Sequence, residues 1–174
     1  MAEPEIPPED EEFWRFSLAF YDQPGVAGAL VALQDRDGRD VNLMLFALWL
    51  GISGRGSLDG GLLAAAAQTA GRLGSEIVEP LRALRRKLHK HPDGDVQKFR
   101  EAVKALELAG EKLIQQRLFR LCLPLQTSMP LADRITAARR NLAVYLGPEG
   151  VRSGEAAIIL DAITAFAAAP QRPA

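Results

Sequence analysis

The stretch from Glu76 to Lys90 constrains the fold of this chain more than any other, because it has the pattern of a helix with two distinct faces. At 100° per residue, four apolar side chains fall within about 60° of one another; they are Ile77, Leu81, Leu84 and Leu88. The neighbouring sector is cationic and contains Arg82, Arg85, Arg86 and His89. An apolar stripe with this spacing is typical of a helix that packs along a second helix.

The second helix of that pair is predicted directly downstream. The turn sequence from His91 to Gly94 ends the first helix, and the next helix is expected to run from about Asp95 until just before Pro124. Its apolar side chains share one sector; they are Val96, Phe99, Val103, Leu106, Leu113, Ile114 and Leu121. Residues 75–90 and 95–123 are therefore expected to form a central αα-hairpin.

Helical patterns also cover most of the remaining chain, at about 11–21, 24–34, 41–50, 62–73, 128–146 and 153–168. Asp40 and Ser153 are predicted N-caps, Gly71 and Gly74 suggest a break with Ser75 as the next N-cap, and Gly147 closes a helix. No stretch alternates with the period of two that marks a strand. The sequence predicts an all-α fold, a single-domain helical bundle of about seven helices over residues 11–169. The tails at 1–10 and 170–174 are expected to be disordered.

Length and composition indicate one ordinary globular domain. The chain has 174 residues, 48% of them hydrophobic, and a net charge of −1. Its charge is unevenly spread, with ten acidic and three basic residues in 1–40 but nine basic and five acidic residues in 72–104. A single cysteine, Cys122, fits a reducing compartment. With no signal-peptide pattern and no apolar run long enough to span a bilayer, a cytoplasmic location is expected.

Several kinds of site are excluded or disfavoured by spacing. The segment Asp35–Asp40 lacks the glycine and glutamate positions of a calcium loop, and the glycine-rich segment Gly51–Gly61 lacks the ending of a phosphate-binding loop. No metal site, cofactor or catalytic residue is predicted. Nucleic-acid binding through the cationic strip is disfavoured, because the domain is mildly acidic and shows no helix-turn-helix spacing.

Charged residues within the apolar sector of the hairpin form the main candidate site. Glu107 lies in that sector or at its edge, and Glu111 lies one turn further on. Because a buried charge without a partner is costly, we expect these carboxylates to pair with two of the three arginines at 82, 85 and 86. Such a network could simply fix the register of the helices. It could instead line a polar pocket in which arginines hold a carboxylate or a phosphate.

The helix at 11–21 is apolar nearly all round and contains Phe13, Trp14, Phe16, Phe20 and Tyr21. It must therefore be covered on most sides. One interpretation is a core helix, and the other is a helix completed by a second chain, which would make the protein a homodimer.

Three segments carry a resemblance to a known family: 26–50, 78–86 and 107–118. In these segments the chain resembles a small proteobacterial family of uncharacterised all-helical proteins, a domain of unknown function, over roughly residues 13–121. The resemblance implies a bacterial, cytoplasmic setting and no particular activity. It singles out Asp40, Asn42, Arg82, Arg86, Glu107 and Glu111 as matches to the family's polar positions. For Asp40 and Asn42, a helix cap and a local hydrogen bond are the simpler interpretation.

Two functions follow from these patterns as hypotheses. The first is a protein-interaction, regulatory or adaptor module, with a partner or a second copy held through the helix at 11–21. The alternative is an enzyme or small-molecule binder that holds an anionic ligand in the pocket formed by the arginines and glutamates.

Overall fold

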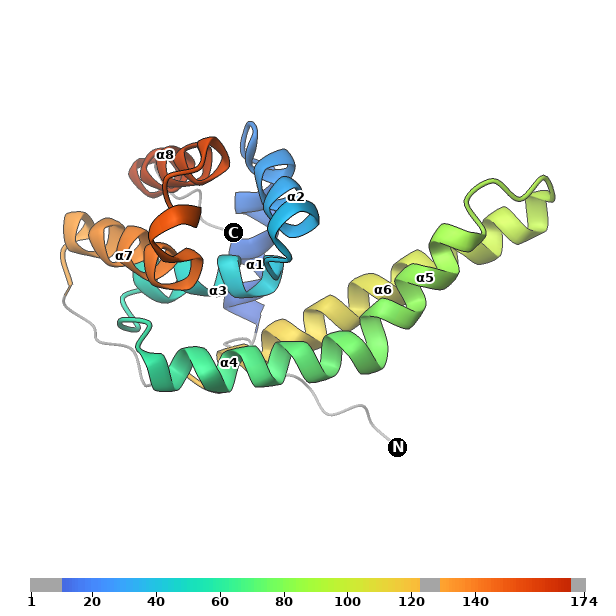
Figure 1. Ribbon diagram of the computed structural model, residues 1–174, viewed down its shortest axis with the longest axis horizontal. Helices are drawn as coiled ribbons and strands as arrows, with labels where there is room; N and C mark the ends of the chain where they lie inside the picture. Colours follow the sequence, from blue (N-terminus) through green and yellow to red (C-terminus); the bar gives the residue numbers. More distant parts are fainter. Residues whose placement is uncertain (1–10, 123–128, 170–174) are drawn as a thin grey trace.

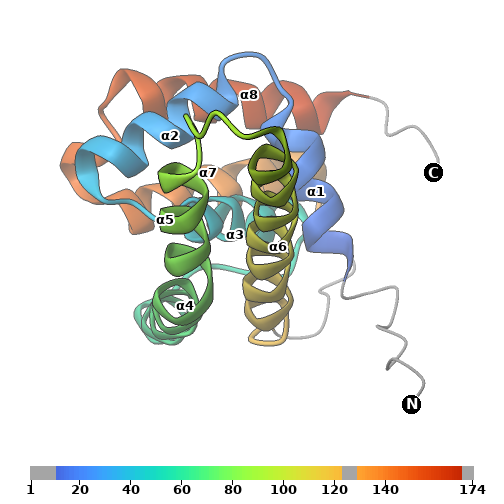
Figure 2. The same cartoon turned by 90° about the vertical axis from the view of Figure 1, so that its right-hand side faces the viewer.

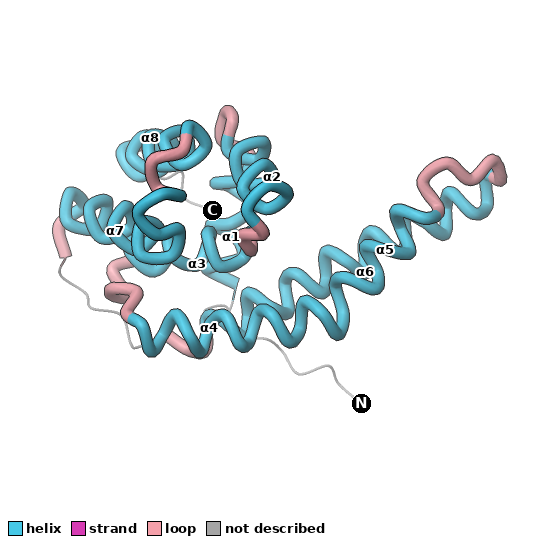
Figure 3. Tube along the Cα trace, viewed as in Figure 1, coloured by secondary structure: helices cyan, strands magenta, loops and turns pink. Residues whose placement is uncertain are grey.

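The computed structural model describes residues 11–122 and 129–169, and these ranges contain helices and no strand (Figures 1 and 3). The α-helices are α1 (Glu12–Tyr21), α2 (Val26–Asp37), α3 (Val41–Ile52), α4 (Gly60–Leu73), α5 (Glu79–Lys87), α6 (Gly94–Phe119), α7 (Leu131–Gly150) and α8 (Gly154–Ala168), and a π-helical turn, Gly74–Val78, joins α4 to α5. The predicted all-α class is confirmed. The tails expected to be disordered, 1–10 and 170–174, and the predicted helix end at 123–124 lie outside the described residues.

Helix α3 forms the centre of the body, with every residue from Asn42 to Gly51 buried. Its N-terminus is capped as predicted, since the Asp40 side chain accepts a hydrogen bond of 3.2 Å from the backbone N–H of Leu43. Trp49 stacks on Phe13 of α1, with ring centroids 5.0 Å apart. A helix buried on all sides requires neighbours in every direction, and the surrounding helices supply them (Figure 1).

The crossing of α3 and α7 depends on the absence of a side chain at Gly51. A Cβ atom built there would lie 2.2 Å from the backbone nitrogen of Ala138 and 2.4 Å from its Cα. Because those atoms belong to the backbone of α7, no rotamer change could relieve the overlap. The two helices can therefore approach this closely only with glycine at position 51.

We predict that Gly51→Ala lowers the free energy of unfolding by about 3 kcal/mol, because α3 and α7 must move apart. Gly71→Ala is the matched control, since it also lies in a helix but has no atom within 4 Å of its added Cβ. That variant should gain about 0.5–1 kcal/mol from the higher helix propensity of alanine. Urea denaturation followed by circular dichroism measures both, and equal effects of the two substitutions would refute the assignment.

The aromatic face of α1 is covered by the chain itself. Phe13, Phe16 and Phe20 are buried, and the rings of Phe16 and Phe20 each meet Phe166 of α8 edge-on, with centroids 5.7 Å apart. For these three side chains the core-helix interpretation therefore holds. Leu18, a large apolar residue of α1 that is 47% exposed, lies on the opposite side of the helix.

Helices α4 and α5 are continuous, which differs from the predicted break at Gly71 and Gly74. Gly74 has helical dihedral angles, and the chain passes through the π-helical turn without interruption. Ser75 is not an N-cap, and its hydroxyl donates to the carbonyl of Arg72. The π-helical turn comes just before Pro80, which has no N–H to donate, so the helix bends there rather than ends. Counted this way, the described residues form seven helical rods.

The hairpin of α5 and α6 is confirmed, and its outer half projects away from the body (Figures 1 and 2). Two of the side chains assigned to its seam are instead largely solvent-exposed, Phe99 at 57% and Leu106 at 58%, and Leu84 is exposed as well. The seam residues that are buried include Val103 and Ile114. A single neighbouring helix covers only part of the apolar sector of α6. In the projecting half of the hairpin, no other described element covers the rest of that sector, so Phe99 and Leu106 stay exposed.

Candidate functional site

The predicted network of arginines and glutamates is present between α5 and α6. Arg82 donates from Nε to Glu107 Oε1 at 3.0 Å and from Nη2 to Glu111 Oε1 at 2.8 Å. Arg85 donates from Nε to the second oxygen of Glu107 at 2.5 Å. Glu107 is buried between the two helices and accepts from both arginines. Two of the three predicted arginines therefore join the network, as expected.

The network extends to α3 through two amide side chains. The Asn42 amide donates to the second oxygen of Glu111, and the Gln115 amide donates to Asn42 Oδ1 at 3.0 Å. The local hydrogen bond proposed for Asn42 is therefore wrong, because its side chain crosses to α6. Gln115 did not figure in the sequence prediction, because it stands among Lys112, Gln116 and Arg117 and no pattern in that stretch marks it as buried. A buried amide there needs a polar partner.

A polar cavity of about 260 Å³ adjoins this network at the N-terminus of α3. Five of the seven predicted site residues line it: Asp40, Asn42, Arg82, Arg86 and Glu111. The other two, Arg85 and Glu107, border a different depression on the other side of α6. Arg86 is exposed and has no ion-pair or hydrogen-bond partner within the described ranges. The sequence thus predicted the composition of this site but not its division between two sides of the hairpin.

The carboxyl groups of the site differ in their electrostatic environment. Burial would raise the pKa of Glu107, but the hydrogen bonds from Arg85 and Arg82 outweigh it and the pKa falls below its ordinary value. Burial dominates at Glu111, whose pKa is raised despite the hydrogen bond from Asn42 and the charge of Arg82. Burial likewise raises the pKa of Asp40. Glu107 is therefore the carboxylate that the arginines hold in its ionised form.

This contrast predicts that two matched substitutions have different effects at neutral pH. Glu107→Gln should lower the free energy of unfolding by about 2 kcal/mol, because it leaves Arg82 and Arg85 without their shared carboxylate. Glu111→Gln should cost less than about 1 kcal/mol, because the folded environment already disfavours the charge at that position. Thermal or urea denaturation of the two variants tests this order. A larger loss for Glu111→Gln than for Glu107→Gln would contradict it.

The pH dependence of the same variants provides an independent prediction. A carboxyl group whose pKa is lowered on folding stabilises the folded state fully above its ordinary pKa of 4.5, and this contribution disappears as the pH falls through the lower folded value. The stability gap between wild type and Glu107→Gln should therefore close below pH 4.5. Glu111 has the opposite sign, so wild type should gain relative to Glu111→Gln as the pH falls towards 4.5. Urea titrations across this range measure both trends.

The sequence comparison bears on these residues directly. A family profile described as "Protein of unknown function (DUF2390)" matches residues 12–118. The chain belongs to this family. The match runs from the start of α1 to the last turn of α6, so it includes every residue of the network and all of the hairpin except Phe119, while α7 and α8 lie beyond it. The predicted resemblance to an uncharacterised family is confirmed, whereas its proteobacterial setting remains a prediction.

Membership of the DUF2390 family assigns no reaction or ligand to the network. Searches among curated proteins and among solved structures found no match to the chain. Within the described residues, no helix is both long enough and apolar enough to cross a bilayer. Function must therefore be argued from the surfaces and cavities of this molecule.

Proposed function

We propose that the protein acts by binding another protein, and that the projecting hairpin of α5 and α6 is the binding element. The observation that carries this proposal is an apolar stripe along the outer side of α6: Phe99, Ala102, Leu106, Ala109 and Leu113. Successive members are three and four residues apart, which places all five within about 80° of one another. The first four are exposed.

A stripe with this spacing is the surface that a partner helix recognises. Alternating steps of three and four residues are the seam pattern of paired helices, in which large side chains of one helix fit between those of the other. The alanines at 102 and 109 would allow close approach, and Phe99 and Leu106 would supply large side chains to bury. Contiguous exposed apolar surface on a soluble domain is typical of an interaction site.

The charges around the stripe indicate the character of the partner. Lys98 and Arg117 of α6 are exposed beside the stripe. Lys98 contacts the Asp95 carboxylate at 2.8 Å, but both side chains are largely in solvent, so this pair is weak and can exchange for a partner's carboxylate. Such a border favours an amphipathic helix with acidic residues beside its apolar face.

Leu106→Glu should abolish partner binding with little effect on stability, because residue 106 is exposed and makes few contacts in the free protein. Val144→Glu is the matched control, since Val144 is also an exposed apolar residue (43%) but lies on α7 in the body. Quantitative mass spectrometry of proteins that co-purify from the host should show one partner captured by wild type and by Val144→Glu but not by Leu106→Glu.

Two further results bear on the same proposal. Higher ionic strength and Lys98→Glu should both weaken the captured complex, because the acidic border of the partner would lose its attraction. Capture that survives Leu106→Glu, or that is lost equally with Val144→Glu, would show that the hairpin stripe is not the binding surface.

The unpartnered Arg86 supports a second candidate, an anionic ligand in the polar cavity of α3, α5 and α6. Arg82 is already paired with two glutamates and Arg39 donates to the carbonyls of Tyr145 and Leu146. Arg86 is therefore the arginine of this cavity whose side chain makes no hydrogen bond or ion pair within the described residues. We expect inorganic phosphate or acetate to bind there, with an affinity at least tenfold lower in Arg86→Ala. Isothermal titration calorimetry tests this, with the exposed Lys90→Ala as the control. Equal affinity in both variants would rule the candidate out.

A further inference from the structure

A second cavity lies far from the hairpin stripe, between α1, α3, α7 and α8. Its volume is about 560 Å³, which is within the usual range for small-molecule sites. Its apolar lining comes from residues distant in the sequence: Phe16, Ala19, Trp49, Ile52, Leu131 and Phe166. It shares no residue with the hairpin stripe or with the network of arginines and glutamates.

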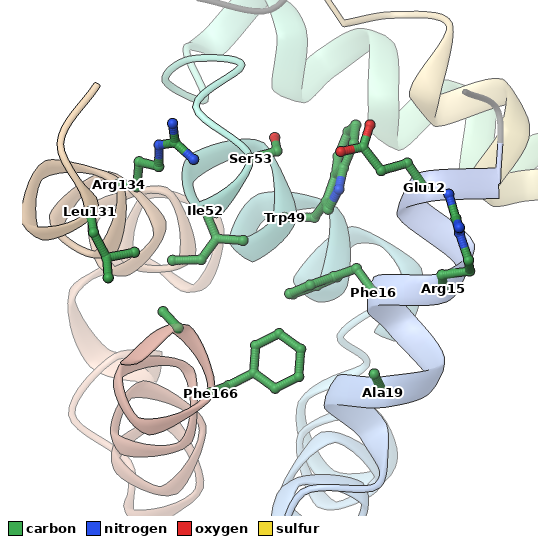
Figure 4. Close-up of a pocket in the computed structure, with 11 residues that line it drawn as sticks. Glu12, Arg15, Phe16, Ala19, Trp49, Ile52, Ser53, Leu131, Arg134 and Phe166 are labelled. Atoms are coloured by element: carbon green, nitrogen blue, oxygen red, sulfur yellow. The ribbon is translucent and has the colours of Figure 1, made fainter. Parts of the chain in front are cut away.

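The cavity has a polar end and an apolar end. Figure 4 shows the polar groups of Arg134, Ser53 and Glu12 at one end, and the rings of Phe16 and Phe166 facing the other. A site of this kind suits a molecule with one polar head and one apolar body, because each part would meet a matching environment.

The charges at the polar end determine the sign of that head. Glu12 is already neutralised, because its carboxylate lies 2.9 Å from Nη2 of Arg55. Arg134 donates from Nε to the carbonyl of Met129 at 2.8 Å, and this bond orients the guanidinium. Its two terminal nitrogens have no partner among residues 11–122 and 129–169. The polar end thus offers the oriented guanidinium of Arg134 beside the Ser53 hydroxyl, while the other cation in the lining, Arg15, is exposed on α1.

We propose that this cavity binds a small amphipathic carboxylate, with an alkyl chain among Phe16, Ile52 and Phe166 and the carboxylate at Arg134. A guanidinium with two free donors matches the two oxygens of a carboxylate. The single oriented guanidinium of Arg134, next to an apolar lining, favours a carboxylic acid with an alkyl chain over a polyphosphate. This proposal does not depend on partner binding by the hairpin, and the experiments below test it separately.

The fluorescence of Trp49 can report binding, because the indole lines the cavity. The chain has two tryptophans, so Trp14→Phe leaves Trp49 as the sole emitter. Decanoate, decanol and decylamine, each below its micelle-forming concentration, serve as probes with the same chain and different heads. Decanoate should give a saturable change and bind at least tenfold more tightly than either of the others, because only its head pairs with Arg134.

Three variants in the same background separate the head from the chain. Arg134→Gln should weaken decanoate at least tenfold and leave decanol unchanged, whereas Ala19→Leu should weaken both by filling the cavity. Arg140→Gln is the control, since Arg140 is exposed on the same helix and does not line the cavity. Thermal melts establish that each variant folds.

The proposal is overturned by any of three results obtained with folded protein. These are no saturable response to decanoate, equal affinity for decanoate and decanol, or an Arg134→Gln variant that binds decanoate as tightly as the Arg140→Gln control. If Ala19→Leu leaves decanoate binding intact, the ligand occupies a different site and the assignment to this cavity is wrong.

Discussion

The burial of α3 on every side is the constraint on which the rest of the structure depends. Fully burying a large apolar side chain stabilises a fold by about 1.5–3 kcal/mol, and every residue from Leu43 to Leu50 except Ala47 contributes a side chain of this kind. A helix with no exposed face cannot be covered by one neighbour, so α1, α2, α4, α6 and α7 must all be positioned around it. The polar side chain of α3 belongs to Asn42, in the first turn of the helix. The network reaches α3 at Asn42, where the helix begins.

The fold class and the hairpin could be predicted from sequence because they depend on local periodicity and on turn residues. The Asp40 cap and the pairing of Glu107 and Glu111 with arginines were predictable for a related reason. Each rests on a group that must find a partner, and the facing helix offered few choices. Glu107 in an apolar sector is a strong signal, since a buried carboxylate without a cation would be costly.

The features that sequence did not predict depend on where distant elements meet. Gly74 resembles a helix break in isolation, but the bend before Pro80 is absorbed by a π-helical turn. The exposure of Phe99 and Leu106 reflects how far the hairpin extends beyond the body, which no spacing within α6 reveals. The cavity of Figure 4 joins Phe16 to Phe166, residues from opposite ends of the chain. Only the packing of α1 against α8 brings them together.

The family profile stops at Leu118, yet the helices beyond it are integral to the fold. Gly51 lies inside the matched range, and it packs against the backbone of α7, which lies outside. Asn141 of α7 is fully buried, and its side chain holds the loop after α3 through the N–H of Leu58 and the carbonyl of Gly56. Without α7, the most apolar helix of the protein would be exposed along one side.

The continuity of α4 and α5 has a mechanical consequence. Residues 60–87 form one bent rod about 42 Å long, at 1.5 Å per residue, with no loop between its buried and projecting halves. At the bend, Gly110 of α6 lies so close to Ile77 and Val78 that the two helices have little room to slide past each other. A force that a bound partner exerts on the tip of the hairpin would therefore be transmitted to the body as a torque. The junction between hairpin and body contains the hydrogen-bonded side chains of Arg82, Glu111 and Asn42.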